Sequence, residues 1–213
     1  MFEIQHKQIR TPGLEIGERV QLPTVYGTFE LIPFLEKATG KEHIALFKGQ
    51  PENRKHVLVR IHSACATGDL FGSMRCDCGE QLHQSLNLIE QAGCGILIYL
   101  QQEGRGIGLM EKMKAYKLQE NGLDTVDANL HLGHQADERD YHVGAEILHY
   151  FNINQIKLLT NNPDKKQGLE HNGIIVESCI PVLSEPNKYN AFYLKTKQER
   201  MGHLLGQLNF EGI

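Results

Sequence analysis

Three of the five cysteines of this chain lie close together, in the segment CATGDLFGSMRCDC. Cys65, Cys76 and Cys78 have the spacing C-x10-C-x-C. A catalytic zinc ion typically has three protein ligands and an open position, whereas a structural zinc ion has four ligands. Three clustered thiols therefore favour a catalytic zinc site. We expect a helix to start near Glu80, and its dipole together with Arg75 to lower the pKa of the Cys78 thiol.

Two other interpretations of the cysteines remain open at this stage. A fourth ligand from His62, His83 or Cys94 would make the zinc site structural. The cysteines can also be ordinary buried side chains, since free cysteine is among the most buried residue types. Cys94 and Cys179, which lie in apolar runs, are predicted to be core residues of this kind.

Two turns carry cations that are suited to anion binding. The segment EGRGIG follows the apolar run GILIYLQQ, so its backbone amides and Arg105 are candidates for a phosphate site. Leu109 replaces the last glycine of G-x-G-x-x-G, so a dinucleotide-binding fold is not predicted. The segment TNNPDKK places Thr160 and Lys165 at the start of a predicted helix. An ordinary tight turn and an ordinary helix cap explain these two segments equally well.

The segment ADERDY contains a candidate acid-base pair. If residues 137–140 are extended, Asp137 and Arg139 point to the same side, and a carboxylate lies beside a permanent cation. Capping of the helix that begins near Tyr141 is the alternative role of these acidic residues. Tyr116 falls on another predicted helix, where the periodicity favours a core position over a role in a site.

Strands and helices that alternate along the chain must position these groups. The predicted strands cover residues 20–35, 43–49, 56–63, 95–102, 155–160 and 174–180. The predicted helices cover residues 80–92, 109–121, 140–151, 163–173 and 193–206. This pattern predicts the α/β (mixed α+β) class: a single domain with a β-rich N-terminal third, followed by alternating helices and strands around a mixed sheet.

Composition and charge exclude several function classes. The chain has 213 residues, 40% of them hydrophobic, which is sufficient for one domain with a real core. Its formal net charge is -4 and it has no continuous basic stripe, which argues against nucleic acid as a partner. Neither a signal peptide nor a membrane-spanning run is found, so we expect a cytoplasmic protein with no membrane partner. In that reducing compartment, clustered cysteines indicate metal binding or catalysis before disulfides.

Several of these segments resemble one known family. RIHSACATGDLFGSMRCDCGEQL, QQEGRGIGL, KAYKLQENGLDTVDAN, ADERDY, LLTNNPDK and ERMGHLL occur in the same order and at the same intervals as in GTP cyclohydrolase II of riboflavin biosynthesis. The resemblance predicts a catalytic domain over residues 21–205, an N-terminal extension over 1–20 and a C-terminal tail over 206–213. It implies a homodimer that hydrolyses GTP to a diaminopyrimidinone ribosyl phosphate with release of formate and pyrophosphate.

The resemblance also implies a set of site residues. The three clustered cysteines match the family's ligands for one zinc ion, and magnesium accompanies the nucleotide. Asp137 matches the proposed proton acceptor, Arg139 the proposed nucleophile toward the α-phosphate, and Tyr116 a residue tied to catalysis. The positions that match GTP contacts are Arg60, Ile61, His62, Ser63, Ala64, Gln81, Glu103, Gly104, Arg105, Thr125, Thr160 and Lys165.

Two positions depart from the family pattern. The family usually has glutamate where this chain has Ala64, and often a second basic residue where it has Asp164. The missing carboxylate keeps an alternative open, a paralogue that binds a nucleotide with altered or partial activity. A zinc nucleoside deaminase is a further alternative, but the sequence lacks the H-x-E and P-C-x-x-C motifs of that class. The chain is also too short for the dihydroxybutanone phosphate synthase domain of some relatives, so a monofunctional protein is expected.

Overall fold

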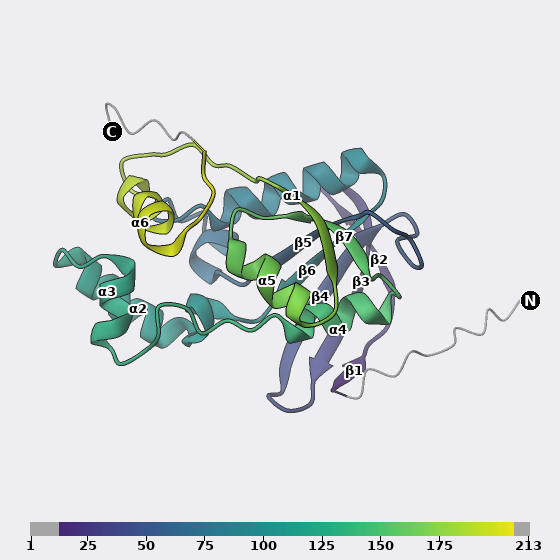
Figure 1. Cartoon of the computed structure of the whole chain (residues 1–213), viewed down its shortest axis with the longest axis horizontal. Helices are drawn as coiled ribbons and strands as arrows, with labels where there is room; N and C mark the ends of the chain where they lie inside the picture. The colour runs from purple at the N-terminus through teal and green to yellow at the C-terminus, as the bar shows by residue number, and fades with distance from the viewer. Residues whose placement is uncertain (1–12, 207–213) are drawn as a thin grey trace, which may run out of the picture.

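A mixed β-sheet forms the centre of the molecule (Figure 1). The structure is a computed structural model that describes residues 13–206. Its strands are β1 (Leu14–Ile16), β2 (Val20–Thr24), β3 (Gly27–Glu36), β4 (Lys41–Lys48), β5 (Val57–Ser63), β6 (Gly95–Leu100), β7 (Gln155–Leu159) and β8 (Ile175–Ile180). They are arranged in the order β1-β3-β4-β6-β5-β7-β8, with β2 also paired to β3.

The sheet has an antiparallel half and a parallel half. The strands β1 to β4 pair in antiparallel fashion, and β4 joins them to β6. In the other half, β5 pairs in parallel with β6 and β7, and β7 with β8. Parallel neighbours need long crossover connections, which helices supply here. The mixed sheet with a β-rich N-terminal part confirms the predicted fold class.

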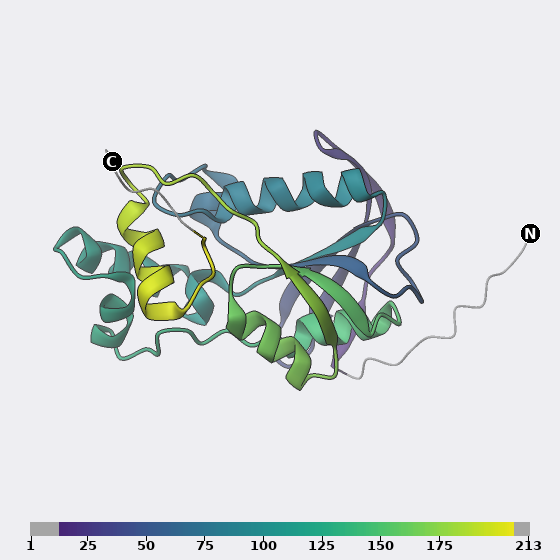
Figure 2. The ribbon, with the colours of Figure 1, turned by 45° about the horizontal axis from the view of Figure 1, so that its top comes forward.

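Helices cover both faces of the sheet. They are α1 (Cys78–Ala92), α2 (Gly108–Glu120), α3 (Thr125–His131), α4 (His142–Tyr150), α5 (Pro163–His171) and α6 (Ala191–Met201), with short helical turns η1 (Ala66–Leu70) and η2 (Glu103–Gly106). Figure 2 shows α1 on one face of the sheet and α4 and α5 on the other. The remaining helices α2, α3 and α6 gather beyond one end of the sheet (Figures 1 and 2).

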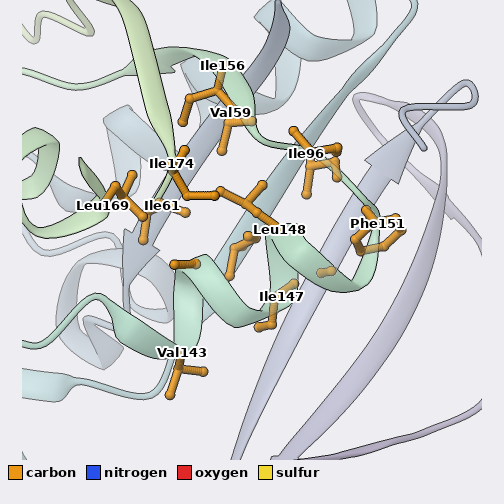
Figure 3. Close-up of a cluster of buried hydrophobic side chains, with 14 of the residues drawn as sticks. Val59, Ile61, Ile96, Val143, Ile147, Leu148, Phe151, Ile156, Leu169 and Ile174 are labelled. Atoms are coloured by element: carbon orange, nitrogen blue, oxygen red, sulfur yellow. The ribbon is translucent and has the colours of Figure 1, made fainter. Parts of the chain in front are cut away.

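Two apolar clusters hold these layers together. The larger one lies between the sheet and α4 and α5, and includes Ile61, Ile96 and Leu148, each fully buried (Figure 3). The smaller one lies under α1, whose Leu86 and Ile89 pack toward the opposite face of the sheet. Because both faces are covered, a central strand such as β6 is apolar along its whole length, as parallel strands commonly are.

Three element predictions need correction. Helix α3 was not predicted from the sequence, although its N-cap Asp124 accepts hydrogen bonds from the backbone amides of Val126 and Asp127. The predicted terminal helix over residues 193–206 is wrong beyond Met201. Gly202 follows in the left-handed conformation with φ of 64°, which ends the helix. The predicted strand over residues 20–35 is divided into β2 and β3, which pair in antiparallel fashion across a turn at residues 25–26. The other predicted helices and strands are present with shifts of a few residues at their ends.

The predicted core positions of two cysteines are also wrong. Cys179 lies in β8, the strand at the edge of the sheet, but is exposed. Cys94 is only half-buried at the start of β6. Part of the predicted N-terminal extension forms β1, while residues 1–12 and 207–213 lie outside the described residues. Within residues 13–206, none of the helices has the length and apolar character needed to cross a membrane.

Candidate active site

A cavity of about 980 Å³, open to solvent, lies at the carboxyl ends of the parallel strands. Residues that directly follow β5, β6 and β7 line it, together with side chains from α2, α3 and α6. The chain passes from β5 to β6 on one side and later places β7 on the other side of β5. Open parallel sheets bind their ligands at such a switch point.

The three clustered cysteines line one end of this cavity. Cys65 directly precedes η1, Cys78 is the first residue of α1, and Cys76 lies in the turn between them. Their Sγ atoms all lie within 4.8 Å of one another, and those of Cys65 and Cys76 are 3.8 Å apart. Two thiolates on one tetrahedral zinc ion, each about 2.3 Å from it, are themselves about 3.8 Å apart. The separation of Cys65 and Cys76 therefore matches that of two ligands of one zinc ion, and Cys78 lies close enough to be the third.

Two glycines allow the cysteines to converge. A Cβ atom on Gly79 would lie 2.5 Å from the carbonyl oxygen of Gly68, which is too close for any side chain. A Cβ atom on Gly68 would lie 3.0 Å from Sγ of Cys76 and 3.3 Å from Sγ of Cys65. The turn η1 thus packs directly on the first turn of α1, because neither residue has a side chain.

The protonation of the thiols differs from the sequence prediction. Hydrogen bonds with the thiols of Cys76 and Cys78 lower the pKa of Cys65 far below its ordinary value. The hydrogen bond with Cys65 raises the pKa of Cys76 to about 11, and that of Cys78 is also raised by its bond to Cys65. The prediction that the thiol of Cys78, at the start of the helix, has a lowered pKa is therefore wrong for the metal-free cluster. The guanidinium of Arg75 lies over the ring of Tyr116, 4.2 Å from its centroid, and donates to Oε1 of Glu120 at 3.1 Å.

Lys112 from α2 lies against the cysteine cluster. Its Nζ atom donates hydrogen bonds to Sγ of Cys65 at 3.1 Å, to Oγ1 of Thr67 at 2.9 Å and to Oε1 of Glu103 at 2.8 Å. Burial disfavours this charge, but the bond to Glu103 and the charge of Cys65 raise the pKa of Lys112, so it stays cationic. Glu103 is fixed in turn by the backbone amide of Ala66, at 2.6 Å from Oε2. A buried cation is therefore held beside a thiolate.

His62 belongs to a separate hydrogen-bond network. Its Nε2 atom lies 3.1 Å from Oδ2 of Asp69, which also accepts bonds from the hydroxyl of Tyr99 at 2.8 Å and the amide of Cys65 at 2.9 Å. Burial lowers the pKa of His62. The metal-binding cluster found in residues 13–206 consists of the three cysteines. No fourth ligand from His62, His83 or Cys94 joins it, which favours the open, catalytic type of zinc site.

A chain of buried polar groups forms the floor of the cavity. Arg60 from β5 donates to the carbonyl of Leu159 at 3.0 Å and to Oε1 of Gln81 at 2.6 Å. Gln81 donates to Asp77 at 2.6 Å, and Asp77 pairs with Nζ of Lys197 from α6 at 2.8 and 2.9 Å. Burial lowers the pKa of Arg60 to about 10. This network attaches α6 to the start of α1.

Asp137 and Arg139 form a close pair at the edge of the cavity. The Nε atom of Arg139 donates to Oδ1 of Asp137 at 2.9 Å, and the backbone amide of Arg139 donates to the same oxygen at 3.0 Å. Burial opposes ionisation, but the bond from Arg139 lowers the pKa of Asp137. Glu138 and Asp140 instead contact His134 and the amide of His142. The two pairs of side chains point to different sides, as an extended segment predicts.

The two predicted anion-binding turns both reach the cavity. Arg105 has a φ of 62° between Gly104 and Gly106, and its side chain donates to the carbonyl of Ala136 at 3.4 Å. Lys165, in the first turn of α5, is buried and donates to the carbonyl of Ile61 at 2.6 Å. Burial and nearby cations lower the pKa of Lys165 well below its ordinary value. Each turn thus presents a cation to the cavity from the end of a strand.

This site can be compared with known proteins. The model of the GTP cyclohydrolase II family matches residues 15–181. This chain belongs to the GTP cyclohydrolase II family. The riboflavin biosynthesis protein RibBA of Parabacteroides distasonis is 62% identical over 199 residues, which are 93% of this chain and 49% of that protein.

Two further relatives show how much of each related protein this GTP cyclohydrolase II family member covers. RibBA of Phocaeicola vulgatus is 62% identical over 192 residues, which are 90% of this chain and 48% of that protein. GTP cyclohydrolase-2 of Buchnera aphidicola is 50% identical over 194 residues, which are 91% of this chain and all of that protein. The chain therefore spans about half the length of the RibBA proteins it matches.

Most positions that the family resemblance implies lie together in the GTP cyclohydrolase II fold. Two of them do not line the cavity: the side chain of Ile61 belongs to the core, and Asp137 lies behind Arg139. Tyr116, predicted to be a core residue by its periodicity, is half-buried and lines the cavity. The others that line it are Arg60, His62, Ser63, Ala64, Cys65, Cys76, Cys78, Gln81, Glu103, Gly104, Arg105, Thr125, Arg139, Thr160 and Lys165.

Several cavity residues of the GTP cyclohydrolase II domain were not predicted from the sequence, among them Lys112, Tyr193, Lys197 and His203. Lys112 shares a face of α2 with Tyr116, four residues later, and this spacing was an available signal. Tyr193 and Lys197 share a face of α6 in the same way, and His203 lies in the motif ERMGHLL. Helical spacing alone does not say which neighbour such a face meets, so these residues were not selected.

Ala64 occupies the position where the GTP cyclohydrolase II family usually has glutamate. It is buried, lines the cavity and donates its backbone amide to the carbonyl of Leu100 at 2.8 Å. Its methyl side chain cannot form a hydrogen bond. The cysteine cluster is contacted instead by Lys112, which donates to Sγ of Cys65 and to Glu103.

Proposed function

We propose that this chain hydrolyses GTP to a diaminopyrimidinone ribosyl phosphate, with release of formate and pyrophosphate, as the first step of riboflavin biosynthesis. The observation that carries the proposal is the juxtaposition of a three-thiol metal cluster and several cations in one cavity. Family membership supports it, because the full-length relative of Buchnera aphidicola is named GTP cyclohydrolase-2. The chemistry needs both parts, since release of C8 as formate breaks two C–N bonds of the purine ring and release of pyrophosphate breaks a bond in the triphosphate.

Zinc is the proposed ion of the cysteine cluster. Three thiols with Sγ atoms within 4.8 Å of one another match its preferred ligands and geometry. Bound zinc supplies a Lewis acid that makes water nucleophilic near neutral pH. The cavity beside Cys65 is where the imidazole ring of guanine would have to lie, with C8 toward the cluster. Lys112 is placed to offset the excess negative charge that three thiolates leave on a divalent ion.

The cations on the other walls are the proposed triphosphate site. Arg105, Arg139 and Lys165 reach the cavity from three different loops, and each is suited to hold phosphate oxygens. Fixed positive charge at these oxygens stabilises the transition state in which the bond between the α- and β-phosphates breaks. Magnesium bound with the nucleotide would add to this effect. Thr160 and Thr125, both buried at the cavity wall, complete the proposed contacts.

The pairing of Asp137 with Arg139 bears on their proposed roles. A nucleophilic Arg139 would have to lose a proton to Asp137. The ordinary pKa values of these groups differ by roughly nine units, which corresponds to more than about 10 kcal/mol. In this structure the pKa of Asp137 is lowered and that of Arg139 is raised, so the gap widens. We therefore favour Arg139 as a protonated clamp on the phosphates, oriented by Asp137, over a nucleophile.

The test is product analysis with matched cysteine variants. Purified zinc-loaded protein is mixed with GTP and magnesium, and formate and pyrophosphate are quantified. We expect both products from the wild type and from Cys179→Ser, because Cys179 is exposed on β8 and far in sequence from the site. Cys76→Ser should lose formate release. Absence of both products from zinc-loaded wild-type protein would refute the proposal.

The alternative of a nucleotide-binding protein with altered activity is not favoured by the comparisons. Its support was Ala64 alone, and Ala64→Glu tests it: a large gain in formate release would show that the missing carboxylate limits the reaction. A homodimer, magnesium and a cytoplasmic location remain predictions.

A further inference from the structure

His203 is held at the cavity wall by the end of α6. After Gly202 ends the helix, the backbone amide of His203 donates to the carbonyl of Lys197 at 3.0 Å. The next amide, of Leu204, donates to the carbonyl of Asn161 at 2.8 Å, in the loop between β7 and α5. Two backbone hydrogen bonds thus fix His203 between α6 and the loop that carries Thr160. Its position is set by the fold and not by its own side chain.

The imidazole of His203 is buried without a partner. The residue is 8% exposed and lines the cavity, yet among residues 13–206 neither Nδ1 nor Nε2 has a hydrogen-bond partner. Buried polar atoms are almost always paired, so an unpaired one at a cavity needs a reason. Arg105 Nη2 and Asn162 Nδ2 are buried and unpaired in the same way. With His203 they are among several unpaired polar groups in the cavity lining, which point to a ligand that supplies the missing partners.

The charges around His203 identify the kind of ligand. Burial, followed by the charges of Lys197, Arg139, Lys165 and Arg105 in that order, lowers its pKa to about 2. The imidazole is therefore neutral, with one N–H donor and one lone pair. Lys197 and Arg139 are paired with Asp77 and Asp137, whereas Arg105 and Lys165 contact backbone carbonyls. These two basic side chains beside a neutral donor suit an anion with several acceptor oxygens, and a phosphate group has this character.

We propose that His203 donates a hydrogen bond to a phosphate oxygen of the bound nucleotide, and that the segment of residues 202–205 is part of the phosphate site. This inference rests on the proposed function for the identity of the nucleotide. It gives a role to the ERMGHLL segment, which otherwise only follows α6. Guanine is the less suitable partner, because its edge carries no negative charge to interact with Arg105 and Lys165.

Binding of inorganic pyrophosphate and of guanosine separates phosphate contacts from base contacts. By titration calorimetry, we expect His203→Leu to bind pyrophosphate about tenfold more weakly than the wild type, equal to about 1.4 kcal/mol. His203→Gln, which keeps an N–H donor, should lose less than threefold. Guanosine binding should be unchanged in both variants. His171→Leu, altered at an exposed position in the last turn of α5, is the matched control and should bind both ligands normally.

An NMR measurement on the wild type avoids any dependence on how the variants fold. With ¹⁵N-labelled histidine, pyrophosphate should shift one ring nitrogen of His203, assigned by its absence in His203→Leu. Unchanged pyrophosphate affinity in His203→Leu, an equal loss of guanosine binding, or an unshifted His203 signal would each overturn the inference. The two proposals fail separately: GTP turnover with normal pyrophosphate binding by His203→Leu refutes only the role of His203. Pyrophosphate binding through His203 without GTP turnover refutes only the proposed function.

Discussion

Replacement of Lys112 by glutamine should weaken zinc binding at the cysteine cluster. The ammonium group lies 3.1 Å from Sγ of Cys65, and its side chain is 9% exposed. At this separation, an effective dielectric constant between about 20 and 80 gives an attraction of about 1 to 5 kcal/mol. Loss of a group that orients a metal ligand typically costs about 10- to 100-fold in metal affinity, or about 1.4 to 2.7 kcal/mol. The two ranges agree, so we expect at least a tenfold weaker zinc complex for Lys112→Gln.

The assay is competition for zinc with a chelator of known affinity at constant pH. Lys114→Gln is the matched control, because Lys114 is on the same helix but is 60% exposed and pairs with Glu111. It should leave the zinc dissociation constant within twofold of the wild type. Thermal unfolding of the metal-free proteins shows whether Lys112→Gln also perturbs the fold. A zinc dissociation constant for Lys112→Gln within twofold of the wild type would refute the argument that this buried charge stabilises the metal complex.

Three more predictions concern the network around the cavity. Asp77→Asn leaves the charge of Lys197 buried and unpaired. The free energy of unfolding, measured in urea, should therefore fall by about 3 to 5 kcal/mol. The control Asp127→Asn, at an exposed position, should change it little. Gly79→Ala pushes η1 away from α1 and should abolish stoichiometric zinc binding, measured by elemental analysis; normal zinc content would contradict the packing argument. For His203, the pKa is lower in the folded than in the unfolded chain, so protonation favours unfolding as pH falls below about 6.5. The wild type should lose about 1 kcal/mol of stability from this group between pH 7 and 5.5, and His203→Leu should show that much less pH dependence.

Local patterns were sufficient to predict most of the fold. Strands such as β6 and helices such as α1 carry their own signals, the apolar run and the glycine that follows the last turn. The cysteine cluster was also predictable, since its three ligands lie within one short segment. Helix α3 was missed because it is short, and only its cap at Asp124 marks it.

The rest of the site depends on contacts between distant segments. Lys197 and Asp77 are 120 residues apart, and nothing local to either residue indicates the other. The protonation of the cysteines was wrong for the same reason. The dipole of α1 is a local effect, whereas the hydrogen bonds among Cys65, Cys76 and Cys78 depend on the packing of η1 against α1. Such pairings follow from the assembled sheet and its covering helices.

Helix α6 also has a consequence for the order in which the molecule matures. It follows β8 in the chain and supplies Lys197 to the buried network, so it leaves the ribosome after every strand of the sheet. A nascent chain exposed only as far as β8 already contains the thiols and the strand-end turns. Its substrate chamber lacks one wall, and Asp77 is still in water. The cavity is therefore complete only after α6 has been synthesised and has docked against the start of α1.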